Sequence, residues 1–271
     1  MHIAISRQFG EIEAFQFGYG PVGRPFMMVY VYAVDGVIID TGQRNMQKHV
    51  IELLRNTQPN RILLTHHHED HSGNAAALGR LHGIDIFGHP ITAEKMAAKR
   101  KILPYQRYIW GKSVDVTTKP LESLIESNRF IFRPIHTPGH SRDHTVFLEE
   151  KNGWLFAGDL YLGDRIKYFR SDEKIFDQID SLKKMRNFDF HALFCSHNPI
   201  LENGKKRLEC KLQFLEDIVG QVQLLQKKGL SDKAIIKRMD PGRDRWVKLM
   251  TMGNVSMANM LRSALCGRTF A

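Results

Sequence analysis

The sequence predicts an α/β fold with a helical region at its C-terminal end. Short apolar runs typical of strands alternate with helical patterns through the first 200 residues. Polar clusters stand directly after several of these runs, and from residue 205 onward the pattern is helical. The 271 residues are enough for one large core with an appendage, so we expect an α/β body that carries an extension.

The predicted elements begin with a hairpin at residues 26–40. This segment consists of two apolar runs around Asp35-Gly36, a dipeptide typical of two-residue hairpin turns. A helix is expected next at residues 43–56, because apolar side chains recur there at helical spacing. The pattern then predicts a buried strand at 61–65, a helix at 72–81, a strand at 84–87 and a helix at 92–101.

Residues 102–127 are weakly patterned, with two prolines and a glycine among aromatic side chains. We expect a surface segment there, with a lid as the alternative. Regular alternation returns in the second half of the body, which predicts strands at 130–135, 145–149 and 154–157, a helix at 173–186 and a strand at 192–196.

The last 68 residues are predicted to be helical. Leucine and valine recur at spacings of three and four between Leu208 and Leu225, which indicates a long helix with one apolar stripe. Further helices are expected at 232–239, ending before Pro241-Gly242, and at 256–266. We therefore divide the chain into a catalytic body, residues 1–203, and a helical extension, residues 204–271, which is packed on the body or hinged to it.

Composition excludes several classes of protein. Hydrophobic residues make up 42% of the chain and charged residues 25%, which is unlike disordered or collagen-like proteins. No apolar run approaches the ~18–20 residues of a membrane-spanning helix, and the first residues lack the apolar core of a secretory signal, so no membrane partner is expected. Three scattered cysteines cannot form a disulfide framework, which favours a cytoplasmic location.

Positive charge is concentrated in the helical extension. The whole chain has a net charge of +10, and residues 204–271 contain 14 Lys and Arg against 6 Asp and Glu, a net charge of +8. A basic region of this kind is either a solvated face or a surface that meets an anionic partner such as nucleic acid, and the sequence leaves both open.

Four potential metal ligands follow the predicted strand at 61–65. His66, His68, Asp70 and His71 stand within six residues, and imidazole with carboxylate is a ligand set that suits Zn²⁺ and similar divalent ions. Alternate side chains of an extended segment point the same way, so His66 and His68 can share one ion while Asp70 and His71 reach another. Six residues cannot complete the coordination of two ions, which predicts more ligands downstream.

Three candidates for these further ligands stand just after later strands. His140 lies in the segment TPGHS, Asp159 in AGD and His197 in CSH. Gly139 and Gly158 precede two of them and allow close approach of the backbone.

In their order and spacing these motifs resemble the metallo-β-lactamase-fold hydrolase superfamily. Asp40 in the segment IIDTG is followed by HxHxDH, TPGHS, GD and a late SH, over about two thirds of the chain. The resemblance implies an α/β fold of the αββα four-layer sandwich type, here with a C-terminal helical extension.

The resemblance also implies a dinuclear metal site. His66, His68 and His140 would hold the first ion, Asp70, His71 and His197 the second, and Asp159 would bridge the two. Asp40 would support the ligand loop from outside the coordination shell. Relatives with an acidic residue at the position of His68 house redox di-iron chemistry, so the histidine favours hydrolysis. The expected cofactors are two divalent ions, Zn²⁺ first, with Mn²⁺ or Fe²⁺ as alternatives.

Some polar residues beside the motifs are expected to have supporting roles. His67 and Glu69 alternate with the ligands and are interpreted as structural. His144, with Asp143 next to it, is expected to orient a metal-binding imidazole. Tyr161 either hydrogen-bonds a substrate oxygen or packs as an ordinary aromatic side chain.

The leading hypothesis is a metal-dependent hydrolase that cleaves an ester, thioester or lactone of a small molecule. A bound ion makes hydroxide available near neutral pH, and Asp70 is the candidate catalytic residue that protonates the leaving group. The alternative is a metal-dependent phosphodiesterase or ribonuclease, because two ions and a basic extension suit that reaction as well. The sequence contains no large insertion and no basic stripe interleaved with aromatics, which disfavours this alternative. A non-catalytic binding module would have lost ligand positions, and none is lost.

Overall fold

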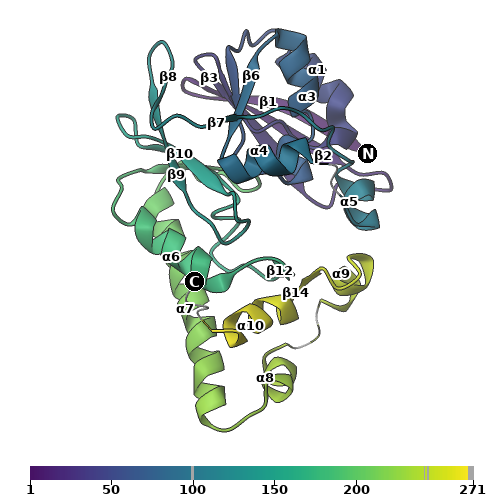
Figure 1. Cartoon of the computed structure of the whole chain (residues 1–271), viewed down its shortest axis with the longest axis vertical. Helices are drawn as coiled ribbons and strands as arrows, with labels where there is room; N and C mark the ends of the chain where they lie inside the picture. Colours follow the sequence, from purple (N-terminus) through teal and green to yellow (C-terminus); the bar gives the residue numbers. More distant parts are fainter. Residues whose placement is uncertain (99–100, 241, 243, 268–271) are drawn as a thin grey trace.

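The computed structural model describes residues 1–98, 101–240, 242 and 244–267 (Figure 1). Its body consists of two sheets packed face to face, with helices on both outer surfaces. This arrangement is the αββα sandwich expected from the sequence, and it is confirmed. Two parts of the expected pattern, the end of the helix at 92–101 and the break at Pro241, fall wholly or partly outside the described residues.

The first sheet has seven strands in chain order. Neighbours are antiparallel from β1 to β4 and parallel from β4 to β7. Its strands are β1 (His2–Phe9), β2 (Ile12–Tyr19), β3 (Met28–Val34), β4 (Val37–Ile39), β5 (Arg61–Leu63), β6 (Asp85–Gly88) and β7 (Lys119–Pro120). The predicted hairpin is confirmed as β3 and β4, and Asp35 and Gly36 between them both have positive φ.

The second sheet has five strands in the order β13-β11-β10-β9-β8. Only the pair β11 and β13 is parallel. Its strands are β8 (Ile125–Glu126), β9 (Ile131–His136), β10 (Thr145–Glu149), β11 (Trp154–Gly158) and β13 (Ala192–Cys195). The four longest of these were all expected from their apolar patterns.

The first hairpin, β1 with β2, is not among the predicted elements. β1 is an edge strand, exposed along most of its length, and it carries polar side chains where an alternating apolar pattern would have revealed it. Residues 102–127 also contain more structure than expected, namely a short helix, α5 (Pro104–Ile109), and the strands β7 and β8.

Three apolar cores hold the layers together. One lies between the sheets and includes Tyr32, Phe147 and Phe156. The second lies under the helices of the first sheet, and the third under those of the second sheet. Besides α5, the described helices of the body are α1 (Gln47–Leu54), which follows the 3-10 turn η1 (Arg44–Met46), α2 (Glu69–Ser72), α3 (Ala75–His82), α4 (Pro90–Ala97) and α6 (Ile175–Met185).

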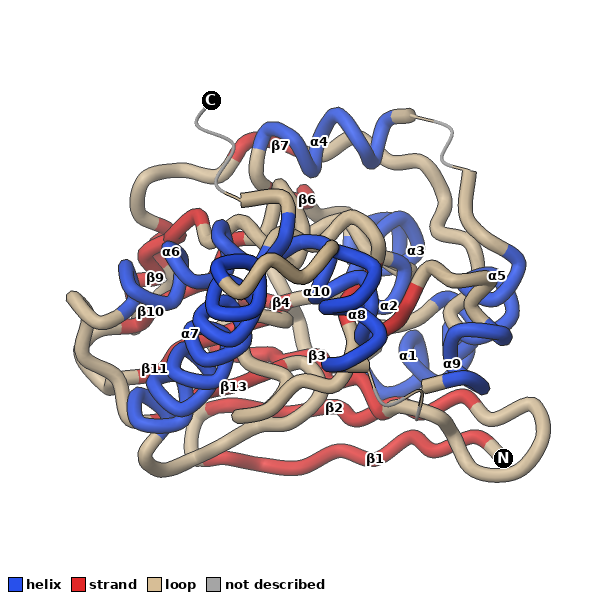
Figure 2. The backbone as a smooth tube through the Cα atoms, turned by 90° about the horizontal axis from the view of Figure 1, so that it is seen from below, coloured by secondary structure: helices blue, strands red, loops and turns tan. Residues whose placement is uncertain are grey.

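The C-terminal helices pack on the second sheet rather than standing free. Leu208, Leu212 and Leu215 share a core with Leu155 and Leu182 of the body, which favours the packed alternative over a hinge. The elements of this region are α7 (Gly204–Lys227), α8 (Asp232–Met239), α9 (Arg245–Met250), β14 (Val255–Ser256) and α10 (Met257–Leu265), with β14 paired to β12 (Phe169–Arg170). Figure 2 shows α7, α8 and α10 in front of the body when the molecule is seen from below. The division at residue 203 stays a prediction.

Across the described ranges, no helix combines the length and the apolar character that crossing a bilayer requires.

Candidate metal centre

The segment after β5 carries the first group of polar side chains into the interior. β5 ends at Leu63, and the chain then passes through Thr65 to His66 and His68 before the short helix α2 begins. All four residues of α2, including Asp70 and His71, are buried. Burial of so many polar groups is costly unless each finds a partner, so their surroundings define the site.

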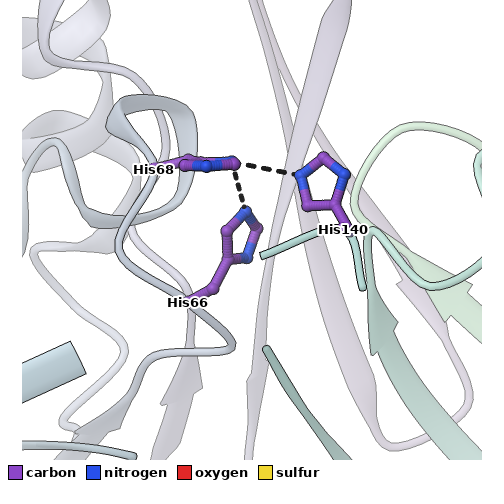
Figure 3. Close-up of side chains that lie close together, drawn as sticks. All are labelled: His66, His68 and His140. Atoms are coloured by element: carbon purple, nitrogen blue, oxygen red, sulfur yellow. Dashed lines mark hydrogen bonds between the residues drawn. The ribbon is translucent and has the colours of Figure 1, made fainter. Parts of the chain in front are cut away.

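Three imidazoles form the first cluster. Nδ1 of His68 lies 3.0 Å from Nε2 of His66 and 3.1 Å from Nε2 of His140, and all three rings are buried (Figure 3). Two nitrogen ligands of a tetrahedral zinc ion with bonds of 2.0–2.1 Å are about 3.4 Å apart. The three ring nitrogens converge at nearly this spacing, so they fit a single metal ion.

Two carboxylates and two imidazoles form the second cluster. Nε2 of His197 lies 3.3 Å from Oδ2 of Asp70 and 3.4 Å from Oδ1 of Asp159, and Nε2 of His71 lies 3.3 Å from the same Asp159 oxygen. Among the described residues, no hydrogen bond reaches the buried His71 Nε2 or Asp159 Oδ1. Unsatisfied buried atoms are rare, and a metal ion between these four side chains would satisfy them.

Asp159 lies between the two clusters. Its Oδ1 faces His71 and His197 of the second cluster, while its Oδ2 lies 3.3 Å from Nε2 of His140 in the first. The seven side chains that the sequence singled out as ligands are therefore brought together, four segments of chain contributing to one buried site.

The two clusters differ in their protonation. Burial lowers the pKa of His66 and His68 well below its usual value, because the charged form loses its hydration. Burial acts in the same direction on His71 and His197, but nearby carboxylates, Asp159 first, outweigh it and raise the pKa of both rings well above its usual value. The same imidazoles keep the pKa of Asp159 well below its usual value despite burial, so this carboxylate is ionised.

Asp40 holds the ligand segment from the end of β4. Its Oδ2 lies 2.8 Å from Nδ1 of His71, and its Oδ1 accepts a hydrogen bond of 2.8 Å from the backbone N–H of Thr65. Ser196, next to His197, donates to the same side chain at 3.3 Å. Asp40 has a left-handed backbone with φ of 61°, a conformation that aspartate tolerates better than most residues.

Gly139 and Gly158 stand next to ligand positions and are required by the backbone. Each has positive φ, and a Cβ at Gly139 would lie 2.4 Å from the backbone nitrogen of Gln178. A Cβ at Gly158 would lie 2.7 Å from Nε2 of His144. The expected close approach of the backbone at these two glycines is confirmed.

His144 lies beside two metal-binding imidazoles, with ring centroids 5.2 Å from His66 and 6.2 Å from His140, but its hydrogen bonds go elsewhere. Its Nε2 accepts a hydrogen bond of 3.0 Å from the backbone N–H of Asp159, and its Nδ1 lies 2.8 Å from the Thr137 hydroxyl. Burial lowers its pKa to about 3, so the ring is neutral. His144 therefore holds the backbone of Asp159 by a hydrogen bond and meets the rings of His66 and His140 by packing alone; its expected role of orienting an imidazole stays a prediction.

Asp143 contacts an imidazole, but that of His67. Its Oδ2 accepts the backbone N–H of His67 at 2.9 Å, and its Oδ1 lies 2.9 Å from Nδ1 of the same residue. Since His67 stands between His66 and His68, these bonds hold the peptide that joins two members of the first cluster. Glu69 accepts a hydrogen bond of 3.2 Å from Gln106 of α5, which agrees with a structural role.

Glu173 is a residue of the site that sequence reasoning missed. Its Oε2 lies 3.3 Å from Nδ1 of His140 and accepts a hydrogen bond of 2.7 Å from Gln178. The carboxylate is buried and, together with Asp159, raises the pKa of His140 despite burial. The sequence places Glu173 only at the start of a helix, and no spacing rule links it to a histidine 33 residues earlier.

Tyr161 lies near the bridging position but its hydroxyl is turned to other partners. It donates to Asp164 at 2.7 Å and accepts from Nε of Arg207 at 3.2 Å. The side chain is buried, so the structure favours the packing alternative over a contact with substrate.

The fold agrees with comparisons to known proteins. The profile of the metallo-beta-lactamase superfamily matches residues 24–197, and the chain belongs to this superfamily. A structure of a beta-lactamase domain protein from Burkholderia ambifaria is similar over 96% of this chain and 88% of that one, with a TM-score of 0.70 and 16% sequence identity.

Two relatives of this chain differ in their names and in how much of their length it covers. The Beta-lactamase-like protein 2 homolog of Drosophila melanogaster is 28% identical over 189 residues, which cover 64% of this chain and 58% of that protein. The hydroxyacylglutathione hydrolase of Serratia proteamaculans is 27% identical over 212 residues, covering 74% of this chain and 75% of that protein. The chain thus spans little more than half of the Drosophila protein.

Proposed function

We propose that this chain is a hydrolase with two metal ions, zinc as the first choice, that cleaves an ester, thioester or lactone of a small molecule. The observation that carries the proposal is the position of Asp159. One carboxylate oxygen faces the first cluster and the other faces the second, at 3.3–3.4 Å from ring nitrogens on both sides. A carboxylate shared in this way suits two neighbouring ions better than one.

In this proposal the two clusters are the ligand sets of the two ions. His66, His68 and His140 hold the first ion, and Asp70, His71 and His197 hold the second, with Asp159 between them. Asp40 and Glu173 orient His71 and His140 through the ring nitrogens that face away from the ions, which is how metal-binding histidines are usually held. Residues 1–203 supply every one of these side chains.

Bound ions would lower the pKa of a coordinated water toward ~7 and polarise the carbonyl of the substrate. The protein's own groups fix where this happens. His66 and His68 are neutral through burial, so their nitrogens are free to bind metal near neutral pH. Neighbouring imidazoles lower the pKa of Asp70 despite its burial, so this carboxylate is free to take up the proton that the attacking water releases and to pass it to the leaving group, a role that we assign as a hypothesis.

A thioester is the substrate class with the strongest support. The Serratia relative is named for the hydrolysis of hydroxyacylglutathione, in which an acyl group is bound to sulfur, and it aligns over three quarters of its length. Three free cysteines within the described residues fit a reducing compartment, and we propose a cytoplasmic location.

The decisive experiment combines metal analysis of the purified protein with a panel of thioesters, esters, lactones, phosphodiesters and RNA. We expect two ions per chain and turnover of an acyl substrate. His68→Ala should abolish turnover, whereas His191→Ala, which changes an exposed histidine outside the clusters, should leave it unchanged. Cleavage of RNA or a phosphodiester without acyl hydrolysis would replace the proposal by the nuclease alternative.

The role of Asp70 has a separate test. Asp70→Asn keeps the size of the side chain and removes its ability to cycle a proton. Because Asp70 is also a proposed ligand of the second ion, turnover is measured at metal concentrations that restore two ions per chain, where we expect it to be slowed by about a hundredfold, the usual contribution of a general acid. Unchanged turnover at full metal content would remove this role and leave the rest of the proposal intact.

A further inference from the structure

Three segments that lie on one side of the molecule expose large apolar side chains. They are residues 20–27 between β2 and β3, residues 103–113 around α5, and residues 245–253 with α9, and we call them together the apolar rim. Trp246 is 77% exposed and Leu249 70% exposed. The exposed apolar side chains of the rim are Val22, Phe26, Met27, Tyr108, Trp246, Leu249, Met250 and Met252.

These segments lie on one side of the molecule although they are far apart in the sequence. The Tyr105 hydroxyl donates a hydrogen bond of 2.6 Å to Oδ1 of Asn254, which joins α5 to the chain just after α9. Figures 1 and 2 both place α5 beside α9, and Figure 2 shows the connection from β2 to β3 at the same edge. α9 contains no buried residue, so its apolar side chains do not contribute to a core.

The rim is attached to the metal centre at two points. The backbone oxygen of Met28, directly after the first segment, lies 2.7 Å from Nδ1 of His197. Gln106 of α5 donates to Glu69, which stands between His68 and Asp70. Two of the three rim segments therefore lie within one or two contacts of the metal centre.

The charge of the rim has one sign. Its three segments contain Arg24, Arg107, Lys112, Arg245 and Lys248, all of them exposed, and not one aspartate or glutamate. The whole chain, in contrast, has 39 basic and 29 acidic residues. A surface that combines exposed tryptophan and aliphatic side chains with an excess of basic ones, with Asp115 and Asp172 as its nearest exposed carboxylates, matches a partner that is both apolar and anionic.

We propose that the apolar rim docks onto the surface of an anionic lipid bilayer, with the metal centre facing the membrane. Tryptophan and tyrosine prefer the boundary between acyl chains and head groups, aliphatic side chains enter the acyl region, and Arg and Lys attract anionic head groups. A second copy of this chain fits less well, because two identical rims would bring ten positive charges together and no carboxylate belongs to the rim itself.

Such docking is peripheral and differs from crossing the membrane. The expectation of no membrane partner depended on the lack of a spanning segment and of a secretory signal, and neither is needed for a surface of this kind. Arg245 and Lys248 belong both to the rim and to the basic extension, so the proposal also gives a function to part of the positive charge of the extension.

The test is co-sedimentation of the full chain with phosphatidylcholine vesicles, with and without phosphatidylglycerol. We expect binding to the anionic vesicles that weakens as salt is added. Trp246→Ser should lower the partition constant about tenfold through the loss of buried apolar area. Leu224→Ser, which changes a 53% exposed leucine on α7, is the matched control and should change nothing.

The contribution of charge is measured separately. Arg245→Gln and Lys248→Gln should each lower binding to anionic vesicles about fivefold. Lys206→Gln and Lys228→Gln remove the same charge from exposed positions of the extension outside the rim and should have a smaller effect. Equal effects in both pairs would reduce the interaction to net charge and overturn the proposal.

Two other results would also overturn it. One is no binding to anionic vesicles at low salt. The other is a dimer in analytical ultracentrifugation that Trp246→Ser dissociates, which would assign the rim to a second copy of the chain. Neither measurement involves turnover, so failure here leaves the proposed hydrolase activity untouched. An unchanged melting temperature of the variants shows that they are folded.

Discussion

The two clusters of the metal centre are built from similar residues but differ in charge. The first consists of three imidazoles, two of which are held neutral by burial. The second contains the carboxylates of Asp70 and Asp159, which favour the protonated form of His71 and His197. Metal binding at the first cluster therefore displaces a proton only from His140, whose pKa is raised, whereas binding at the second must displace the protons of two rings.

The largest effect is expected from Asp159→Asn, because the carboxylate of Asp159 faces both clusters. An amide in place of the carboxylate removes the negative charge that faces both clusters. We expect metal content to fall below two ions per chain and turnover of an acyl substrate to fall about a thousandfold, equivalent to several kcal/mol of transition-state stabilisation. Elemental analysis and steady-state kinetics measure the two changes.

Asp164→Asn is the control for this variant, since Asp164 lies five residues further on and contacts Tyr161 and Arg207 instead of the clusters. If Asp159→Asn kept both ions, the bridging position would be wrong.

An intermediate effect is expected from the carboxylates behind the ligands, one for each cluster. Asp40→Asn tolerates the left-handed backbone but weakens the hold on His71, and we expect the affinity for the second ion to fall between ten- and about a hundredfold. Glu173→Gln should lower the affinity for the first ion about tenfold, because its contact with His140 is longer, 3.3 Å against 2.8 Å. Titration of metal-free protein with zinc measures both.

The separation of these two effects is the informative part. Each variant should lower the affinity of the protein for one ion and leave its affinity for the other nearly unchanged. A variant that lowered the affinity for both ions equally would indicate a general loss of structure at the site rather than an effect on one cluster.

The smallest effect concerns pH. The raised pKa of His71 and His197 means that protons compete with the metal there, and the competition grows as pH falls. At the first cluster protons compete for one ring, His140, whose pKa is raised, while the lowered pKa of His66 and His68 keeps these two rings free of protons until lower pH. We therefore expect the second ion to leave before the first as dialysis buffers become more acidic. Simultaneous loss of both ions at every pH would contradict the difference between the clusters.

Much of the site could be predicted because its ligands stand in short motifs at the ends of strands. His66, His68, Asp70 and His71 follow β5 directly, and His140, Asp159 and His197 each follow a strand of the second sheet, so the apolar runs locate them. The supporting residues were predicted less well. Asp40 supports the ligand segment from outside the clusters, as the resemblance implied. The hydrogen bond of His144 goes to the backbone N–H of Asp159 rather than to an imidazole, and Glu173 was not identified.

The reason lies in the range over which a sequence pattern acts. Alternation and helical spacing determine the direction of side chains over a few residues, which is enough to group His66 with His68. They carry no information on how β12 and the start of α6 pack against the loop of His140, and this packing is what brings Glu173 to its ring.

The sequence by itself determined the α/β alternation, the helical extension and the set of candidate ligands, because each depends on local periodicity or on residue type. The tertiary structure alone decided that Asp159 presents one oxygen to each cluster, that the extension shares a core with the second sheet, and that three distant segments form the apolar rim. These features depend on contacts between residues far apart in the chain, and packing of the whole fold determines them.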